Sequence, residues 1–558
     1  MDRNHVVEES DKRRLSPTLA RLDYSEQFLA EWPAQIGQTP NLGYINVAGN
    51  ALEVLSTIVC QETQLEYLNI NDNFISELPE ALASCQALQE LHCANNQLKQ
   101  LCTAIGQLVD LHTLCLKNNQ LRALPTTLVQ LKALRILQLE GNALEQLPPI
   151  ILQLADLQEL NLVDTELSVL PSCVGLKRLE QLDVSINTLE SLDAALANCA
   201  SLRYLDASHN QITTLTKALA NLTGLEELYL EGNPLVNWPP VLAYWPQLKR
   251  LNLASTRLQN IRPSVAKLRD LQYLNLNANQ LTSLPEEISG LTALIQLDVS
   301  DNQLQHLPQS FKELGALEIL NLEFNPLEHL PLAVCALTQL KDLDVTGIEL
   351  NQLPYSIGQL TELKRLDLSE NYLESLPDSM EALTRLRILD ARENQLHELP
   401  KTMSVCKALR ELYLAHNLFN EAGACIGELV KLKRLDLSYN ELTNVPANWR
   451  QLQRLEWLNL EGNAFYEFPK EILSIVRLRE LDLSDNEIDD VPEGIAQLQQ
   501  LKWLDLRNNQ LTELPFELGL LAEVLEDLYL EGNYFDKEEK EQIIALLPHT
   551  NIYFDVEE

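Results

Sequence analysis

Aspartate recurs at one position of many short segments in which leucine and polar residues alternate. In Leu366-Asp367-Leu368 both leucines point to one side of an extended strand, so the carboxylate points to the other. Carboxylates about 4.8 Å apart on neighbouring strands would raise one another's pKa or hold a column of cations. A structural role is the alternative, because Asp or Asn alternates at this position along the whole chain, whereas a site is local. The aspartates at this position are Asp183, Asp206, Asp298, Asp344, Asp367, Asp390, Asp436, Asp482 and Asp505.

Motifs of known catalytic and nucleotide sites are missing from the sequence. There is no GxxxxGK[ST], no GxGxxG after a strand, no HExxH and no paired CxxC, and the nine histidines are dispersed one by one. We therefore predict a protein that is not an enzyme and binds no cofactor or metal. Cys115 is a separate candidate, since Leu114-Cys115-Leu116 turns its thiol outward where a reagent could reach it, although the sequence shows no base beside it.

Aromatic and arginine side chains also gather at outward positions towards the C-terminus. Such residues carry most of the binding energy in protein interfaces. Trp457 and Trp503 share one phase two repeats apart, about 10 Å, with Glu480 between them. We call this predicted partner-binding set the aromatic patch, and packing of each ring on its neighbours is the alternative. The aromatic patch consists of Tyr413, His416, Arg434, Tyr439, Trp457, Trp503 and Tyr529.

The surroundings of the aromatic patch indicate the kind of partner it would bind. Acidic residues predominate there, which favours a protein with a basic rim and an apolar anchor. These acidic residues are Glu461, Asp482, Asp485, Asp505 and Glu531. A smaller group of the same type lies nearer the middle of the chain, at Tyr204, Tyr229, Arg250 and Tyr273.

All these positions belong to one repeated frame. The stretch LKRLDLSENYLESLP, residues 363–377, returns every 23 residues along nearly the whole chain, as in a leucine-rich repeat. Leu366 and Leu368 face the core of a strand, Asn371 satisfies backbone groups of the following turn, and Pro377 opens a short helix or turn on the outer side. A single repeat cannot bury this much leucine, so the repeats must stack.

The frame therefore predicts an α/β repeat fold, a right-handed leucine-rich repeat solenoid of horseshoe type. One continuous parallel sheet is expected on the concave face, with short helices or turns on the convex face. We expect a polar N-terminal segment at residues 1–18, an array of about 23 repeats at 19–533, and a cap at 534–558. Asp536 to Glu539 resembles a capping box, which predicts that a short helix begins this cap before a last strand at Ile552-Tyr553-Phe554.

Three repeats depart from the frame at the asparagine position. Thr165, Thr256 and Ile348 replace it, each four repeats from the next. Isoleucine cannot form the side-chain hydrogen bond, so we expect a backbone amide near Ile348 to be left to water. The replacements indicate either tolerated drift or a local change in curvature or a flexible joint.

Charge and cysteine usage limit the class of partner and the compartment. The net charge of -38 argues against nucleic acid or an anionic membrane as partner, although it would also serve solubility. No apolar stretch is long enough to span a membrane. The ten cysteines are scattered through the repeats, as expected in a reducing cytoplasm. We expect a monomer.

The frame LxxLxLxxNxLxxLPxxhxxLxx resembles the intracellular 23-residue class of leucine-rich repeat proteins. This class includes Ras-binding scaffolds of the Sur-8 type, plant intracellular Ras-group-related proteins and many bacterial proteins. The segment LYLEGNYFDKEEKEQIIALLPHTNIYFD, residues 528–555, looks like the closing cap of the bacterial members. The resemblance implies a cytoplasmic, non-catalytic scaffold that binds a protein on its concave face. The alternatives are a secreted or injected bacterial virulence factor that binds a host protein, and an unrecognised metal-dependent enzyme.

Overall fold

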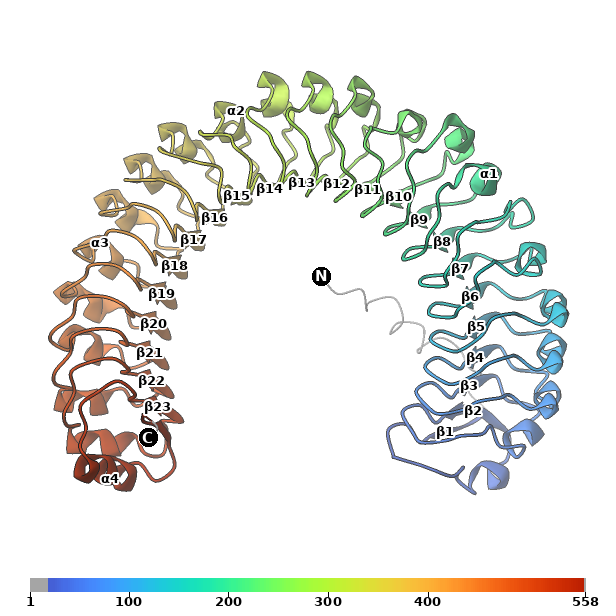
Figure 1. Cartoon of the computed structure of the whole chain (residues 1–558), viewed down its shortest axis with the longest axis horizontal. Helices are drawn as coiled ribbons and strands as arrows, with labels where there is room; N and C mark the ends of the chain where they lie inside the picture. The colour runs from blue at the N-terminus through green and yellow to red at the C-terminus, as the bar shows by residue number, and fades with distance from the viewer. Residues whose placement is uncertain (1–18, 556–558) are drawn as a thin grey trace. The chain divides into compact units, whose positions relative to one another are not determined.

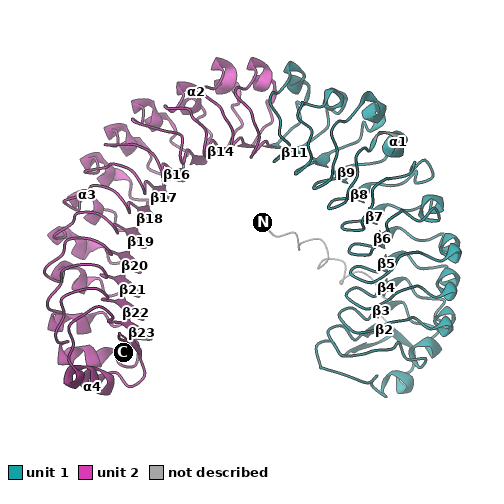
Figure 2. Cartoon of the chain, viewed as in Figure 1, with its two compact units in different colours: residues 1–274 teal, residues 275–558 magenta. Residues whose placement is uncertain are grey.

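The computed structural model describes residues 19–555 of the chain. The chain divides into two compact units, Met1–Leu274 and Asn275–Glu558 (Figure 2). The polar segment expected at residues 1–18 lies outside the described residues. In each unit, short strands line one face and 3-10 helices of three to six residues line most of the opposite face (Figure 1). The predicted solenoid with a parallel sheet is confirmed.

Most strands are three residues long, with a buried central leucine between two residues that face away from the core. The strands of the first unit are β1 (Ala20–Asp23), β2 (Leu42–Asn46), β3 (Tyr67–Asn69), β4 (Glu90–His92), β5 (Thr113–Cys115), β6 (Ile136–Gln138), β7 (Glu159–Asn161), β8 (Gln181–Asp183), β9 (Tyr204–Asp206), β10 (Glu227–Tyr229) and β11 (Arg250–Asn252). The division between the units falls within β12 (Tyr273–Asn275). The strands of the second unit are β13 (Gln296–Asp298), β14 (Ile319–Asn321), β15 (Asp342–Asp344), β16 (Arg365–Asp367), β17 (Ile388–Asp390), β18 (Glu411–Tyr413), β19 (Arg434–Asp436), β20 (Trp457–Asn459), β21 (Glu480–Asp482), β22 (Trp503–Asp505), β23 (Asp527–Tyr529) and β24 (Asn551–Tyr553).

Successive strands pair in parallel and without a register shift through most of each unit. In the second unit Arg365, Leu366 and Asp367 of β16 face Ile388, Leu389 and Asp390 of β17. A residue at one strand position therefore lies beside its counterpart from the next repeat. The outward residues form two rows, which we call the first-position row and the third-position row.

Four α-helices occur among the described residues: α1 (Asp193–Leu196), α2 (Leu332–Cys335), α3 (Ala424–Gly427) and α4 (Lys537–Leu546). A 3-10 helix usually begins directly after the repeat proline, as at Pro377 before Asp378–Ala382. Half of the expected capping box is present at α4, where the Asp536 carboxylate accepts a hydrogen bond from the Glu539 amide at 2.9 Å. The Glu539 carboxylate instead accepts a hydrogen bond from the Leu514 amide at 3.2 Å. In the part of the chain that the structure describes, no helix has both the length and the apolarity needed to cross a membrane.

The recurrent asparagine forms the expected hydrogen-bond ladder. In the repeat of Asn394, Oδ1 accepts from the Leu373 amide at 3.0 Å, and Nδ2 donates to the Leu368 carbonyl at 2.9 Å. The same Nδ2 also lies within hydrogen-bond distance of two carbonyls of its own repeat, those of Ala391 and Arg392. Each ladder asparagine thus closes its own turn and satisfies buried backbone groups of the preceding repeat.

The expectation that an amide near Ile348 is left to water is wrong. The turn of the preceding repeat changes its hydrogen bonds instead: the Leu327 amide donates to the Asn325 carbonyl at 2.8 Å, and the Glu328 amide donates to the Ile348 carbonyl at 2.9 Å. Glu328 takes a φ of 59° to allow this. The repeats before Thr165 and Thr256 form the same altered turn, with Glu145 and Val236 donating to the two threonine carbonyls. The three exceptions are therefore one recurring turn type.

Candidate binding surface

All residues of the aromatic patch lie in the second unit, and they occupy three different positions within their repeats. Arg434, Trp457 and Trp503 lie in the first-position row, and Glu480 lies between the two tryptophans as predicted. Tyr413 and Tyr529 end their strands, β18 and β23, in the third-position row. His416 and Tyr439 lie beyond the strands, in the turns just before the ladder asparagines, where each has a positive φ, 53° and 50°.

Three pairs of patch residues are in contact. The Arg434 guanidinium lies 4.8 Å from the Trp457 ring centroid. His416 and Tyr439 stack with centroids 4.4 Å apart and planes at 5°. Trp503 and Tyr529 pack at 5.5 Å with their planes tilted by 51°. Part of each aromatic surface is thus used for lateral packing, as the alternative interpretation expected, while both tryptophans stay partly exposed.

Two further residues extend the pair of Trp503 and Tyr529. Tyr553 of β24 stacks on Tyr529 with centroids 4.5 Å apart and planes at 9°, and the Arg507 guanidinium lies 5.4 Å from the Tyr529 ring centroid. Sequence reasoning identified the last strand but did not add Tyr553 to the patch. Its position one repeat after Tyr529, in the same row, is the signal that could have identified it.

Carboxylates beside the patch hold its phenols as hydrogen-bond donors. The Tyr439 hydroxyl donates to Glu461 at 2.6 Å, and this bond together with burial raises the pKa of Tyr439 to about 12. The Tyr413 hydroxyl donates to Glu411 at 2.9 Å, and burial followed by this bond raises the pKa of Tyr413 to about 12. Both tyrosines are therefore protonated at neutral pH.

The aspartates of the third-position row have the structural role that was the alternative to a cation column. Their carboxylates typically accept from the amide two residues later, as Asp482 does from Ser484 at 3.0 Å. Asp505 is fully buried and forms an ion pair with Arg507 at 2.6 Å, so it adds little to the acidic surface expected around the patch. Within residues 19–555, no three His, Cys, Asp or Glu side chains are grouped so that they could hold a metal ion.

Asp482 gives a prediction about pH. Burial raises the pKa of Asp482 to about 6, with a contribution from Asp505, and hydrogen bonds from Ser484 only partly oppose this. Its carboxyl is thus protonated in the folded protein at a pH where it is ionised in the unfolded chain. This contribution to stability is present at low pH and is lost as pH rises through about 6.

We therefore expect the free energy of unfolding of the wild type, relative to Asp482→Asn, to fall by about 2 kcal/mol between about pH 4.5 and pH 7.5. Denaturant unfolding at both pH values measures this difference. Asparagine can accept the Ser484 hydrogen bonds, as Asn459 accepts from the Glu461 amide at 2.9 Å. A difference that does not change with pH would contradict the raised pKa.

The mid-array residues also come together, all within the first unit. Tyr204 and Tyr229 pack with centroids 5.5 Å apart, and Arg250 donates to the Tyr229 hydroxyl at 3.1 Å. The Arg250 guanidinium lies 4.5 Å from the Tyr273 ring centroid. The predicted mid-array group is therefore a second set of connected side chains on the strand face.

Sequence reasoning missed a third aromatic group near the start of the first unit. The Arg21 guanidinium lies 4.7 Å from the Tyr44 ring centroid, and Tyr44 stacks on Tyr67 at 4.5 Å with planes at 8°. His92 continues the series, 5.1 Å from Tyr67. The spacing of 23 residues from Arg21 to Tyr44 and on to Tyr67 could have revealed the group.

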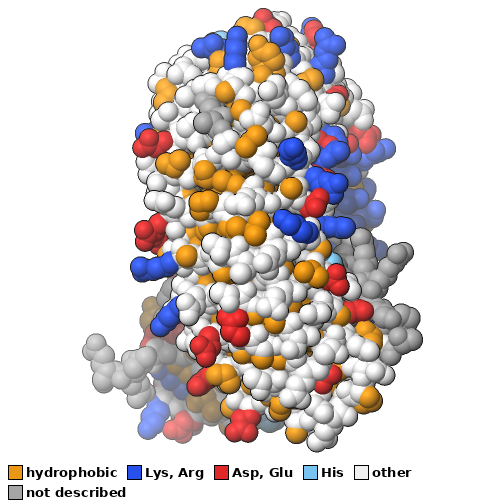
Figure 3. All heavy atoms as spheres, turned by 90° about the vertical axis from the view of Figure 1, so that its right-hand side faces the viewer, with side chains coloured by type: hydrophobic (Ala, Val, Ile, Leu, Met, Phe, Trp, Pro, Cys, Tyr) orange, Lys and Arg blue, Asp and Glu red, His pale blue; other side chains and the backbone are white. Residues whose placement is uncertain are grey.

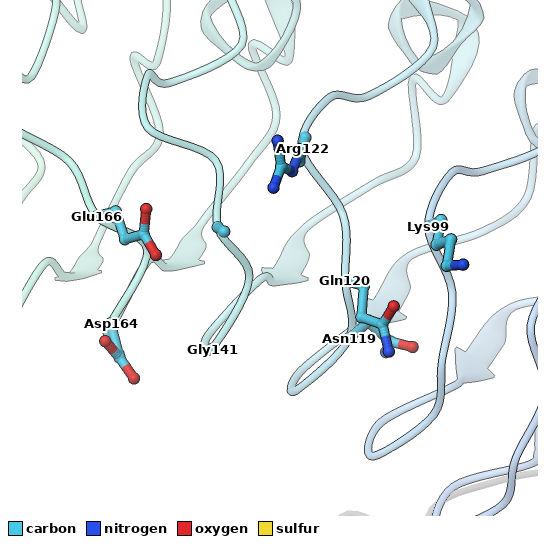
Figure 4. A pocket seen from close by; sticks show the side chains of 8 residues that line it. Lys99, Asn119, Gln120, Arg122, Gly141, Asp164 and Glu166 are labelled. Carbon is cyan, nitrogen blue, oxygen red and sulfur yellow. The ribbon is translucent and has the colours of Figure 1, made fainter.

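A groove in the first unit is lined by charges of both signs (Figure 4). Its volume is about 590 Å³, and Lys99 and Arg122 line one part while Asp164 and Glu166 line another. Gly141 lies between these two pairs of residues, just before the altered turn in which the Glu145 amide donates to the Thr165 carbonyl. All four charged side chains are exposed to solvent, so the groove is a polar surface feature.

The outer surface has a different character. On the face drawn in Figure 3, hydrophobic side chains are scattered in small groups among polar atoms, and Lys and Arg gather along one side. Val169 and Val174 are exposed hydrophobic residues of the first unit. Connected rings and guanidinium groups are thus a feature of the strand face.

A stack of short parallel strands that carries connected aromatic side chains on its open face defines a repeat protein suited to binding other molecules. The chain belongs to the leucine-rich repeat family. The model described as "Leucine rich repeat" matches residues 177–235, 246–304, 286–327, 338–396, 361–419, 407–465 and 476–535. A second model, "Leucine Rich repeats (2 copies)", matches residues 63–105. Neither indicates a catalytic family.

Several solved structures are similar to this chain. A leucine-rich repeat protein of Leptospira interrogans is 34% identical over 72% of this chain and 96% of its own, with a TM-score of 0.62. The plant peptide hormone receptor RGFR1, in complex with RGF2, is 26% identical over 93% of this chain and 95% of its own, with a TM-score of 0.56. The ectodomain of the Arabidopsis receptor kinase HAESA shares the fold, with a TM-score of 0.57. It is 24% identical over 96% of this chain and 91% of its own. No curated protein gives a significant sequence match.

Proposed function

We propose that this protein is a non-catalytic interaction scaffold that binds a protein partner through the aromatic patch. The observation that carries the proposal is the pair of partly exposed tryptophans in one row of the strand face, Trp457 in contact with Arg434 and Trp503 in contact with Tyr529. Rings held by such contacts lose little side-chain entropy when a partner covers them. The arrangement favours binding to a surface whose side chains are already ordered before the partner arrives.

The partner is expected to carry an apolar or aromatic anchor inside a basic rim. Glu480 between the tryptophans and the exposed Asp485 make the surroundings acidic, whereas Asp505 is neutralised by Arg507. The Arg434 guanidinium lies over the Trp457 ring, 4.8 Å from its centroid, so it extends the ring surface as well as adding a positive charge. Opposite charges on the partner would set orientation, and the rings would supply most of the binding energy.

The comparisons support a protein or peptide ligand at the level of the family. RGFR1, 26% identical to this chain, is described in complex with RGF2. A cytoplasmic location stays a proposal that rests on the scattered cysteines. The bacterial relative favours a bacterial source, which keeps open the secreted or injected protein that binds a host target. Fractionation of source cells distinguishes the two, because an exported protein is found outside intact cells.

The experiment that tests the proposal is a pull-down from source-cell lysate with the wild type, Trp457→Ala/Trp503→Ala and Tyr355→Ala. Tyr355 is an aromatic residue with 72% of its surface exposed outside the patch, so it controls for general stickiness. We expect one protein to be retained by the wild type and Tyr355→Ala and lost from the double variant. Its measured affinity should fall by about 2 kcal/mol or more, roughly 30-fold, with the melting curve nearly unchanged.

Recovery of the same proteins by all three forms would overturn the assignment of the aromatic patch. The corresponding variant of the mid-array group, Tyr204→Ala/Tyr229→Ala, then tests the second set of connected rings. Retention of a protein that only this variant loses would move the site to the first unit.

A further inference from the structure

Basic side chains follow one another along one edge of the sheet in the second unit. The residues directly before the strands β15 to β22 (Figure 1) form a column, because the backbone amide of each donates to the carbonyl of the member one repeat earlier. The Arg387 amide, for example, donates to the Lys364 carbonyl at 2.8 Å. Seven of the eight members are basic, and we call the column the basic edge. Its members are Lys341, Lys364, Arg387, Arg410, Lys433, Glu456, Arg479 and Lys502.

The repeat frame by itself does not require a cation at this position. In the first unit the residues directly before β3 to β11 form the corresponding column, which contains three cations and three carboxylates. Glu226 in that column pairs with Arg203 at 2.7 Å and with Lys249 at 2.6 Å. The accumulation of one sign of charge is therefore a property of the second unit. The first-unit column is Glu66, Gln89, His112, Arg135, Gln158, Glu180, Arg203, Glu226 and Lys249.

The middle of the basic edge lacks counter-charges. At its two ends Lys341 pairs with Glu318 at 2.6 Å and Lys502 pairs with Glu526. Among the residues that the structure describes, no carboxylate forms an ion pair with the three members between Lys341 and Lys433. Like charges about 4.8 Å apart on neighbouring strands destabilise a sheet, so the fold accepts a repulsion that an anion would relieve. These three members are Lys364, Arg387 and Arg410.

Further cations lie close to the C-terminal half of the basic edge. Two residues before each of three successive members, the chain carries another basic residue, and all three of these side chains are exposed. They add to the positive potential along this side of the second unit. These residues are Lys431, Arg454 and Arg477.

We propose that the basic edge binds a short acidic polypeptide segment of a partner protein. The eight members span about 34 Å at one strand spacing per repeat, and an extended segment of about ten residues covers that length. Carboxylates on such a segment supply the counter-charges that the middle of the edge lacks. The basic edge is chemically distinct from the aromatic patch, which presents rings on the strand face and suits a partner with a basic rim.

The composition of the edge favours a polypeptide over a nucleic acid. Proteins that bind single-stranded nucleic acid place aromatic side chains for base stacking beside their basic residues. Neither the basic edge nor the set of residues two positions earlier contains an aromatic residue. A long polyanion would also extend beyond the edge along a protein with a net charge of -38. The residues two positions earlier are Gln339, Glu362, Arg385, Ala408, Lys431, Arg454, Arg477 and Gln500.

The experiment measures the fluorescence anisotropy of a labelled peptide of ten glutamates as the full-length protein is added. The edge variant, Lys364→Gln/Arg387→Gln/Arg410→Gln, removes the three cations that lack counter-charges. We expect it to bind the peptide about tenfold more weakly than the wild type at about 50 mM NaCl, where screening is weak. Raising the salt to about 300 mM should weaken binding by the wild type more than binding by the edge variant.

The matched control is Arg135→Gln/Arg203→Gln/Lys249→Gln, which removes three cations from the corresponding column of the first unit and changes the net charge equally. Its affinity for the peptide should fall by less than about threefold, because only the general field of the protein changes. The melting curve of the edge variant should be unchanged or shifted to higher temperature, since like charges have been removed. A loss of binding is then not a loss of folding.

Failure of this proposal is distinguishable from failure of the aromatic patch. Trp457→Ala/Trp503→Ala should bind the glutamate peptide as the wild type does, because its substitutions lie on the strand face. Equal affinities of the edge variant and the control variant, or no saturable binding by the wild type, would overturn the proposal.

Two other occupants of the edge are tested with the same proteins. An oligonucleotide of ten thymidines that binds the wild type more tightly than the peptide, and is lost from the edge variant, would overturn the assignment to a polypeptide. Self-association of the wild type in sedimentation that the edge variant lacks would assign the edge to a second copy of this chain instead. We expect neither the oligonucleotide nor a second copy to occupy it.

Discussion

Replacing Asn394 with alanine is expected to lower the free energy of unfolding by about 2 to 5 kcal/mol. Asn394 is buried and forms hydrogen bonds to the Leu373 amide and the Leu368 carbonyl of the preceding repeat. Alanine would leave both groups in the core without a partner, at about 1–3 kcal/mol each. The effect is large because one side chain satisfies the backbone of two repeats.

Denaturant unfolding and hydrogen exchange of the amides around Leu373 measure this loss together, since a long repeat array can unfold in parts. Asn420→Ala, an exposed asparagine in the next repeat, is the matched control and should change stability by less than about 0.5 kcal/mol. Asn394→Thr should be only slightly milder than Asn394→Ala. A threonine hydroxyl can donate to the carbonyl three residues earlier, as Thr165 Oγ1 does to the Leu162 carbonyl at 2.7 Å, but it does not replace the bonds to the Leu373 amide and the Leu368 carbonyl. Equal stability of Asn394→Ala and the wild type would show that the hydrogen bonds of the Asn394 side chain do not stabilise the fold.

Leu368→Ala is expected to cost about 2–5 kcal/mol through the cavity it leaves in the second unit. Leu368 is fully buried and directly follows β16. Because the segments around it are tied to the adjacent repeats by backbone hydrogen bonds, they cannot collapse freely into the space. The midpoint of denaturant unfolding should shift accordingly.

Two leucine variants calibrate this prediction. Leu368→Met keeps the volume and should cost less than about 1.5 kcal/mol. Leu332→Ala removes a side chain that is 70% exposed and should change stability by less than about 0.5 kcal/mol. If Leu368→Ala were as mild as Leu332→Ala, Leu368 would not belong to a tightly packed core.

The architecture was predictable because the determining residues are periodic. Leu366, Leu368, Asn371 and Pro377 each specify a local structure, and their recurrence every 23 residues leaves stacking as the only way to bury the leucines. The alternation in each strand also predicted the rows, so Glu480 lies between Trp457 and Trp503 as expected. Binding by these residues stays a prediction.

Contacts between different phases of the repeat were harder to predict. The altered turn at Leu327 depends on the residue one repeat later, Ile348, so a search for matches to the frame shows only the replacement. The ion pair of Arg507 with Asp505 depends on side-chain conformation, which spacing does not specify. By contrast, His92 and Cys115 share one phase 23 residues apart, and a comparison of neighbouring repeats would have paired them.

The altered turns limit how such an array can be shortened or extended by recombination. Ordinary repeats accept and donate the same ladder bonds, so one of them can be deleted or duplicated in frame and its neighbours still match. The repeats of Asn325 and Ile348 must be inherited together, because the turn after Asn325 is already closed on its own carbonyl and fits only a successor without the asparagine. The same holds for the pairs that end at Thr165 and Thr256. Crossover points that preserve the fold therefore lie outside these three pairs.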